Sequence, residues 1–360
     1  MPIKILTVVG ARPQFVKAAV VSREIMRRGS AEEVLVHTGQ HFDDNMSSIF
    51  FEELGIPSPK YNLGIGGGTH GANTGRALEG LEAVIVSEKP DWVLVYGDTD
   101  STLAGALAAA KLNVPIAHVE AGLRSFNRRM PEEVNRILTD HVSTLLFAPS
   151  GVAVRNLAQE GISGDGVKMV GDVMFDAVKM FTGLAAGRSS IVADLGLLPK
   201  GYILATLHRK ENTDDESRLR SILDGLRQAD VPVILPLHPR TRNRIREFGL
   251  SHGEQVRVID PVGYLDMMLL QRDARAIATD SGGMQKEAYF HDVPCVVLRD
   301  ETEWVELIEI GVNRLAGSDA AVIAEALRAA TPNGASAYGI YGEGDTAAKV
   351  VDSLIEASSR

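Results

Sequence analysis

Several carboxylates in the sequence follow short apolar segments of the kind that form buried strands. Asp98 comes after one such segment and Glu120 after the next. Glu132 precedes Arg136 by one helical turn, which puts both on one face of a helix. Carboxylates that lie together can act as acid and base, because burial and mutual repulsion separate their pKa values. Each also has a structural alternative: Asp98 could cap the helix that follows it, and Glu132 could form a surface ion pair with Arg136.

A second group of residues is suited to binding phosphate. The segment Asp280-Ser-Gly-Gly precedes a helical pattern. Its two glycines allow close approach to the backbone, and a helix N-terminus offers free N–H groups. With Arg12 and Lys17, which follow the first apolar segment, it predicts a diphosphate site in a cleft between two domains. The alternative is a Gly-Gly turn that only starts a tight helix.

Histidines add further candidates. His208 and His238 end apolar segments at corresponding points of the second half. An imidazole there can act as acid, base or phosphate donor, or simply cap a helix. His118 and Glu120 share a strand face, but no third ligand has suitable spacing and Cys295 lies far away, so no metal site is expected.

These residues need a scaffold of parallel strands to bring them together. Runs rich in Val, Ile and Leu alternate with helical patterns along the whole chain. The runs are 3–9, 33–38, 91–96, 115–119, 144–148, 167–171, 202–208, 232–238, 256–260, 275–280 and 294–298. Continuous apolar strands are typical of parallel sheets buried on both faces, where ligands bind beyond the carboxyl ends of the strands. The pattern predicts two doubly wound α/β domains.

The strand count restarts after Gly171, which predicts domains at 1–171 and 172–344. A final helix at about 345–360 could pack back on either domain. The first helix, from about Arg12, should end at Gly29 as a C-cap. Gly66, Gly68 and Gly71 satisfy G-x-G-x-x-G, but no buried strand precedes them. We therefore expect a loop there, which could serve as a lid, rather than a dinucleotide site.

Composition narrows the class of protein. The chain has 360 residues, 45% of them hydrophobic and 23% charged, with a formal net charge of −10 and one cysteine. This excludes a disulfide scaffold and argues against a general nucleic-acid binder. No run approaches the ~20 apolar residues of a membrane span, and the N-terminus lacks a signal-peptide pattern. We expect a two-domain cytoplasmic protein with no membrane partner.

Motifs over nearly the whole chain resemble those of the non-hydrolysing UDP-N-acetylglucosamine 2-epimerases. They are GARPQFVK (10–17), GDTDST (97–102), HVEAGLRS (118–125), MPEEVNR (130–136), His208, TDSGGMQKE (279–287) and YGEGDTA (341–347). The resemblance implies two Rossmann-like domains facing a deep cleft, the GT-B fold, in a homodimer. It also implies reversible epimerisation at C2 of a UDP-linked acetamido sugar, for surface polysaccharide precursors.

In that family the C2 proton is removed and UDP is expelled from C1, giving a 2-acetamidoglucal; UDP then adds back while C2 is protonated from the other face. No cofactor or metal is implied. The resemblance makes Asp98, Glu120 and Glu132 the acid/base candidates, with Arg136 and His208 as partners. It implies that UDP is held by Arg12, Pro13, Lys17, His238, Ser281, Gly282, Gly283 and Glu287, the last toward the ribose hydroxyls.

Three segments depart from the usual family pattern. Gln14 stands in place of Glu, residues 39–43 (GQHFD) replace the Gln-His-Arg of an allosteric site, and residues 303–306 (EWVE) replace Glu-Arg-Pro-Glu. This set resembles the branch that acts on UDP-2,3-diacetamido-2,3-dideoxy-glucuronic acid. Arg128 and Arg129 could face the carboxylate of such a uronate, or form a solvated basic turn.

Two functions of other classes share the architecture. A GT-B glycosyltransferase using a UDP-sugar would need an acceptor groove and no set of carboxylates around C2. A catalytically silent sugar-nucleotide sensor would keep the UDP pocket and lose the acid/base residues, all of which are present here.

Overall fold

A computed structural model describes residues 2–40, 55–331 and 339–359 of the chain, which divides into two compact units. Unit 1 comprises Met1–Lys179 and Tyr338–Arg360, and unit 2 comprises Met180–Ala337. The boundary lies beyond the expected position after residue 171, because a helix, α7 (Val173–Ala186), runs across it. Within the described ranges, no helix is both long and apolar enough to cross a membrane.

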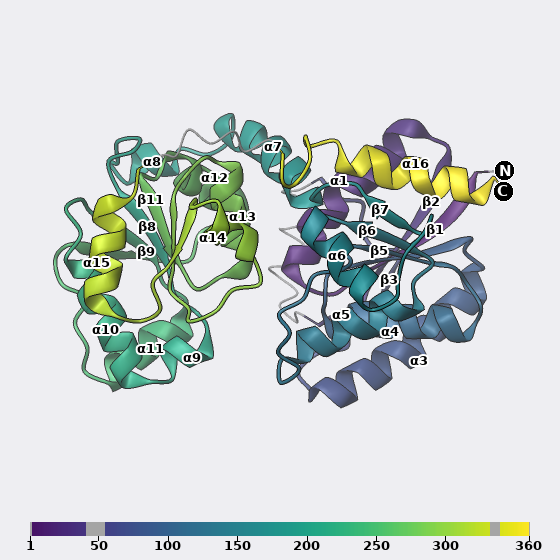
Figure 1. The fold of residues 1–360 in the computed structure, drawn as a ribbon, viewed down its shortest axis with the longest axis horizontal. Coiled ribbons are helices and arrows are strands. Elements are labelled where there is room, and N and C mark those ends of the chain that lie inside the picture. Colours follow the sequence, from purple (N-terminus) through teal and green to yellow (C-terminus); the bar gives the residue numbers. More distant parts are fainter. Residues whose placement is uncertain (1, 41–54, 332–338, 360) are drawn as a thin grey trace. The chain divides into compact units, whose positions relative to one another are not determined.

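Unit 1 is built on a parallel seven-stranded sheet with the order β3-β2-β1-β4-β5-β6-β7. Its strands are β1 (Ile3–Val9), β2 (Ala31–His37), β3 (Tyr61–Asn62), β4 (Trp92–Tyr96), β5 (Ile116–Val119), β6 (Leu145–Ala148) and β7 (Val167–Met169). Its helices are α1 (Arg12–Arg28), α3 (His70–Glu88), α4 (Asp100–Lys111), α5 (Pro131–Val142), α6 (Gly151–Gln159) and α16 (Thr346–Ser358). Helices α3, α4 and α5 cover one face of the sheet, and α1 and α16 cover the other (Figure 1).

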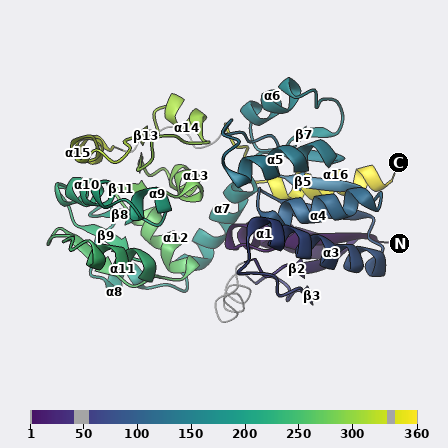
Figure 2. The same cartoon turned by 90° about the horizontal axis from the view of Figure 1, so that it is seen from below.

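Unit 2 has a parallel six-stranded sheet with the order β10-β9-β8-β11-β12-β13. Its strands are β8 (Ile203–Thr206), β9 (Val233–Pro236), β10 (Val256–Ile259), β11 (Ala276–Thr279), β12 (Cys295–Val297) and β13 (Asn313–Leu315). Its helices are α8 (Ile191–Asp194), α9 (Lys210–Thr213), α10 (Glu216–Arg227), α11 (Pro239–Glu247), α12 (Tyr264–Asp273), α13 (Gly282–Phe290), α14 (Val305–Glu309) and α15 (Ala320–Ala329). As in unit 1, helices lie on both faces of the sheet (Figure 2).

Both sheets reverse their strand order once, and the candidate site residues lie at these reversals. In unit 1 the reversal lies between β1 and β4, and in unit 2 between β8 and β11. Connections from the carboxyl ends of these strand pairs leave toward opposite faces, which opens a crevice at the sheet edge. Arg12 and Asp98 follow β1 and β4, while His208 and Ser281 follow β8 and β11. The predicted α/β class is confirmed, with the candidate residues at both reversal points.

The eleven predicted strands are all present, but β3 and β13 were not predicted. Both are short edge strands, and β13 exposes Arg314 and Leu315, so neither produces a continuous apolar run. The first helix ends as expected: Gly29 has φ 65° and its N–H bonds to the carbonyl of Ile25. Gly66 and Gly68 lie in a loop, as expected. Gly71 does not, because Thr69 caps α3 and Gly71 lies in the first turn of that helix.

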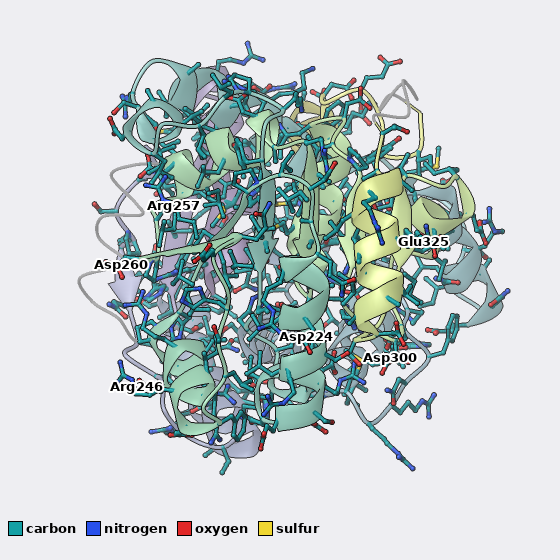
Figure 3. All side chains as sticks on the ribbon, turned by 90° about the vertical axis from the view of Figure 1, so that its left-hand side faces the viewer. Asp224, Arg246, Arg257, Asp260, Asp300 and Glu325 are labelled. Atoms are coloured by element: carbon teal, nitrogen blue, oxygen red, sulfur yellow. The ribbon has the colours of Figure 1, made fainter. Side chains whose placement is uncertain are left out.

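One face of unit 2 carries charges of both signs. Figure 3 shows Asp224, Asp260, Asp300 and Glu325 among Arg246 and Arg257. Several are paired, for example Asp260 with Arg242 at 2.8 Å and Asp300 with Arg218 at 3.0 Å. Glu325 also pairs with Arg314 and Asp224 with Arg227, so these acidic side chains are each compensated by a neighbouring arginine.

The C-terminal helix α16 belongs to unit 1, where it packs beside α1 (Figure 1). The buried carboxylate of Asp176 accepts hydrogen bonds from the backbone N–H groups of Thr346 (3.2 Å) and Ala347 (2.7 Å) at the start of α16. At its other end, Trp92 Nε1 donates to Ser358 Oγ at 2.7 Å. The carboxylate supplies acceptors for N–H groups that the helix itself cannot satisfy.

We expect Asp176→Ala to lower the free energy of unfolding of unit 1 by about 1–3 kcal/mol, because it leaves buried donors without a partner. Asp352→Ala, which removes an exposed ion pair on α16, is the control and should cost about 0–1 kcal/mol. Urea denaturation in a Trp304→Phe background measures this, since Trp92 of unit 1 is then the only tryptophan. Equal losses in both variants would contradict the role of Asp176.

Candidate active site

The turn between β1 and α1 is packed tightly against the start of α4. A Cβ on Gly10 would lie 2.1 Å from Ser101 Oγ and 2.3 Å from Thr38 Oγ1, so only glycine fits there. The turn leads directly into Arg12 and Pro13, which occupy the first positions of α1 and are exposed. An arginine at the start of a helix, at the reversal point of the sheet, is well placed to bind an anion.

Lys17 and Glu120 form a buried ion pair beside β4. The Lys17 ammonium, one turn into α1, contacts the carboxylate of Glu120 directly, and both residues are more than 90% buried. A Cβ on Gly97 would lie 3.3 Å from Glu120 Oε2 and 3.4 Å from Lys17 Nζ, so the pair adjoins the residue before Asp98. Lys17, which we expected beside the diphosphate, is thus also the ion-pair partner of the acid/base candidate Glu120.

Glu120 has a strained backbone. Its φ is +77°, in the left-handed region that side chains other than glycine seldom adopt. Strain of this kind costs on the order of 1–3 kcal/mol and persists only where the surroundings enforce it. The backbone N–H groups of Glu120 and Ala121 both donate to the carbonyl of Phe147 at 3.1 Å, which fixes this turn at the end of β5.

Asp98 is held by Arg136. Arg136 Nη1 lies 2.5 Å from Asp98 Oδ2, and the Asp98 side chain keeps 33% of its surface exposed. The surrounding protein raises the pKa of Asp98 by desolvation; Arg136 opposes this shift and the nearby Glu120 carboxylate adds to it. The alternative role as a helix cap is wrong, because Thr99 caps α4 by accepting from the Thr102 N–H. Asp98 thus pairs with Arg136 and leaves a third of its side chain exposed, where a ligand can reach it.

Glu133, and not Glu132, is the helix partner of Arg136. Arg136 Nε donates to Glu133 Oε2 at 3.0 Å, whereas Glu132 is exposed at the start of α5. The Glu133 carboxylate also accepts from the backbone N–H groups of Ser125 (2.9 Å) and Phe126 (2.8 Å). Although burial opposes it, these donors together with Arg136 lower the pKa of Glu133. Sequence reasoning missed Glu133; its spacing of three from Arg136 was the available signal.

His118 is part of a buried hydrogen-bond network. Its Nδ1 lies 2.7 Å from Asp140 Oδ1, and its Nε2 lies 2.8 Å from the carbonyl of Gly97. Both ring nitrogens therefore lie at hydrogen-bond distance from oxygen atoms of the protein. The other oxygen of Asp140 accepts from Arg124 (2.7 Å) and from the Gly122 N–H (3.0 Å). The network fixes the backbone immediately before Asp98.

In unit 2, the N-terminus of α13 forms an open cradle. Ser281 caps the helix, and no heavy atom lies within 4 Å of a Cβ placed on Gly283. On the other side, a Cβ on Gly282 would come within 2.2 Å of Glu303 Oε1, and Trp304 Nε1 donates to the Gly282 carbonyl at 2.9 Å. Gly282 thus allows residues 303–304 to pack closely against the helix, whereas Gly283 leaves the backbone accessible.

Three more predicted residues lie in unit 2: His208, His238 and Glu287. The carboxylate of Asp280 accepts from the backbone N–H groups of His208 and Arg209, which holds the half-exposed His208 at the end of β8. His238 caps α11, with its Nδ1 accepting from the Arg240 N–H at 3.3 Å, so the cap alternative is correct for this residue. Glu287 accepts from Gln271 at 2.8 Å, and burial raises its pKa.

The geometry thus assembles two groups of the predicted residues. In unit 1, Lys17, Glu120, Asp98 and Arg136 lie around Gly97, while Glu132 takes no part in these contacts. In unit 2, Ser281, Gly282, Gly283 and Glu287 share α13 with Asp280 and His208 beside it. Residues 41–43 of the variant segment lie outside the described residues.

Comparison with known proteins identifies the family of this chain. The sequence model described as UDP-N-acetylglucosamine 2-epimerase matches residues 23–355. The UDP-2,3-diacetamido-2,3-dideoxy-D-glucuronate 2-epimerase of Pseudomonas aeruginosa is 54% identical over 98% of this chain and 99% of its own. The UDP-N-acetylglucosamine 2-epimerase of Methanocaldococcus jannaschii is 44% identical over 88% of this chain and 89% of its own.

Solved structures show the same relationship. The structure of the Methanocaldococcus jannaschii UDP-GlcNAc 2-epimerase in complex with UDP-GlcNAc and UDP has a TM-score of 0.88 and 41% identity, covering 99% of this chain and all of that one. The structure of the Neisseria meningitidis UDP-GlcNAc 2-epimerase bound to UDP-GlcNAc has a TM-score of 0.87 and 31% identity, covering 98% of this chain and 100% of that one. The two-sheet fold is therefore shared over nearly the whole chain. The chain belongs to the UDP-N-acetylglucosamine 2-epimerase family and is an isomerase of that family.

Proposed function

We propose that the chain interconverts the C2 epimers of a UDP-linked acetamido sugar, of the UDP-N-acetylglucosamine to UDP-N-acetylmannosamine type. The observation that carries this is the pair of carboxylates beside Gly97. Asp98 and Glu120 come from neighbouring strands and each is held by its own cation, Arg136 or Lys17. Two carboxylates kept close but in different environments are suited to removing and returning a proton.

The reaction proceeds by elimination and re-addition. A carboxylate takes the C2 proton, the electron pair of the C–H bond forms the C1–C2 double bond, and the C1–O bond breaks to release UDP. The resulting 2-acetamidoglucal is then protonated at C2 from the opposite face while a UDP oxygen adds back to C1. Because the C2 proton is only weakly acidic, stabilisation of the departing diphosphate must supply much of the rate.

The residues divide by role between the two units. Asp98, Glu120 and Glu132 are the acid/base candidates, with Arg136 and His208 near the leaving group. The residues proposed to hold UDP are Arg12, Pro13, Lys17, His238, Ser281, Gly282, Gly283 and Glu287. The open backbone at Gly283 and the capped start of α13 support phosphate binding, because free N–H groups there favour an anion. Lys17 has a second role, as the counter-charge of Glu120.

The same reaction on UDP-2,3-diacetamido-2,3-dideoxy-glucuronic acid is the second candidate. It is favoured by the 54% identity to the Pseudomonas aeruginosa uronate enzyme. Arg128 and Arg129 also support it, because both are exposed on the turn whose backbone is pinned by Glu133. A uronate substrate carries a carboxylate that such guanidinium groups can bind in a bidentate manner.

Incubation of the protein with each UDP-sugar in D₂O tests the function directly. We expect NMR to show deuterium at C2 of both epimers for at least one substrate, since the proton taken from C2 exchanges with solvent. Comparison of the rates on UDP-N-acetylglucosamine and on the diacetamido-uronate identifies the preferred sugar. Normal UDP binding without any C2 exchange on either substrate would overturn the epimerase assignment.

Asp98→Asn and Glu120→Gln should each lower kcat by about 10²–10⁴-fold while changing UDP affinity little, as expected for acid/base groups. The pKa of Asp98 is raised, so if its ionised form is the base, kcat should fall on acidification at a higher pH than for an exposed aspartate. Asp352→Asn, on the exposed side of α16, is the matched control and should keep kcat. Isothermal titration with UDP separates the cases: loss of UDP binding in both variants would make the carboxylates structural.

We also propose that the chain is a cytoplasmic homodimer that supplies precursors of surface polysaccharides. Val134 and Leu138 support self-association, since they lie one helical turn apart on α5 and are 39% and 43% exposed. Light scattering should give about twice the 38.7 kDa of one chain, and the mass of a single chain would contradict the dimer. Recovery of the protein outside the cytoplasmic fraction would contradict the location.

A further inference from the structure

Glu133 is a buried carboxylate that binds three N–H groups. It lies in the first turn of α5 and is 0% exposed. Its Oε1 accepts from the backbone N–H of Phe126 (2.8 Å), and its Oε2 accepts from the backbone N–H of Ser125 (2.9 Å) and from Arg136 Nε (3.0 Å). Hydrogen bonds to an ionised acceptor are stronger than those between neutral groups. The carboxylate therefore ties the turn before α5 to the arginine on that helix.

Arg136 carries this constraint to Asp98. The guanidinium group is planar and rigid, so a bond at Nε fixes the direction of its other nitrogens. With Nε bound to Glu133, Nη1 lies 2.5 Å from Asp98 Oδ2. The neighbouring Asn135 Nδ2 donates to the Asp98 carbonyl at 2.9 Å. Two consecutive residues of α5 thus bind the side chain and the backbone of Asp98, and Glu133 sets the orientation of one of them.

The same carboxylate holds a strained turn. Phe126 has φ 58° and is 72% exposed, so its ring contributes little packing that could hold this left-handed backbone. Strain of this kind persists only where the surroundings enforce it. The bonds from the N–H groups of residues 125–126 to Glu133 supply that restraint. The turn continues into the exposed arginines at 128–129.

We propose that Glu133 is a positioning residue of the epimerisation: it orients the Arg136 guanidinium toward Asp98 and holds the turn at residues 125–126. This inference rests on the proposed function. Although burial opposes it, the hydrogen bonds from residues 125–126 and the charge of Arg136 lower the pKa of Glu133. The carboxylate is therefore ionised at neutral pH, and both of its oxygens are acceptors.

Glu133→Gln replaces one acceptor oxygen with an NH₂ group of similar size. Whichever way the amide lies, its NH₂ faces at least one of the three N–H donors and leaves it unpaired. Arg136 then loses its fixed orientation, and kcat should fall by about 10–100-fold, as expected for a displacement of about 1 Å. The dissociation constant of UDP, measured by isothermal titration, should stay nearly unchanged, because Glu133 holds none of the groups proposed to bind UDP.

A double-mutant cycle shows whether Glu133 acts through Arg136. Arg136→Gln removes the guanidinium group, so Glu133→Gln then has no arginine left to misalign. The double variant should therefore have nearly the kcat of Arg136→Gln alone, whereas two independent effects on the barrier would add and the two losses in kcat would multiply. NMR-monitored deuterium exchange at C2 measures these slow rates.

Asp176→Asn is the matched control, because Asp176 is also a buried carboxylate that binds two backbone N–H groups in unit 1. It should lower the melting temperature and leave kcat of the folded protein unchanged. Hydrogen exchange gives a readout besides activity. The amides of residues 125–126 should exchange about 10-fold faster in Glu133→Gln and at the natural rate in Asp176→Asn.

A folded Glu133→Gln that keeps the natural kcat, or that loses UDP affinity in place of kcat, would overturn this role. So would a loss that multiplies in full with that of Arg136→Gln. If Glu133→Gln does not fold, Glu133→Asp replaces it, since it keeps the charge but withdraws it by one methylene; natural kcat in that folded variant is then the contrary result. Failure of the proposed function is distinct, because it would appear as absence of C2 deuterium exchange in the natural protein.

Discussion

The carboxyl end of β4 is the point on which the candidate site of unit 1 depends. The consecutive carbonyls of residues 96–98 each accept a hydrogen bond from a side chain of a different element: Gln14 of α1, His118 of β5 and Asn135 of α5. A strand end has no neighbouring strand to satisfy these acceptors, and unpaired buried carbonyls are costly. The three side chains meet that requirement and, in doing so, fix the place where Asp98 leaves the sheet.

The charges of the site are organised in the same way. Lys17 and Arg136 do not stand ready as free cations; each is paired with a carboxylate that we assign to proton transfer. Such pairing offsets the cost of burying Lys17, Glu120 and Arg136, and it holds the carboxylates in one orientation. Among the groups proposed to bind UDP, Arg12 is exposed in unit 1, and the backbone of Gly283 is accessible in unit 2. The net charge of −10 for the whole chain gives no indication of this.

Much of the fold and part of the site could be predicted from the sequence. Continuous apolar runs identified eleven strands, and their ends led to Asp98, Glu120 and Ser281, because position beyond a parallel strand follows from the pattern alone. Edge strands such as β3 could not be found this way, since they are short and partly exposed. The sequence also could not show that Arg136 pairs with Glu133 rather than Glu132, because this depends on which side of α5 faces the sheet.

Glu120 shares its left-handed backbone with Lys89, Asn113 and Phe126 of unit 1, but it is the one of these four that pairs with Lys17. Glycine would adopt the same conformation without strain. It would also remove the carboxylate that pairs with Lys17 and leave a buried ammonium unpaired, at a cost of about 3–5 kcal/mol that exceeds the relief of strain. Engineering of a more heat-resistant variant should therefore keep position 120 fixed, because stability and chemistry depend here on the same carboxylate.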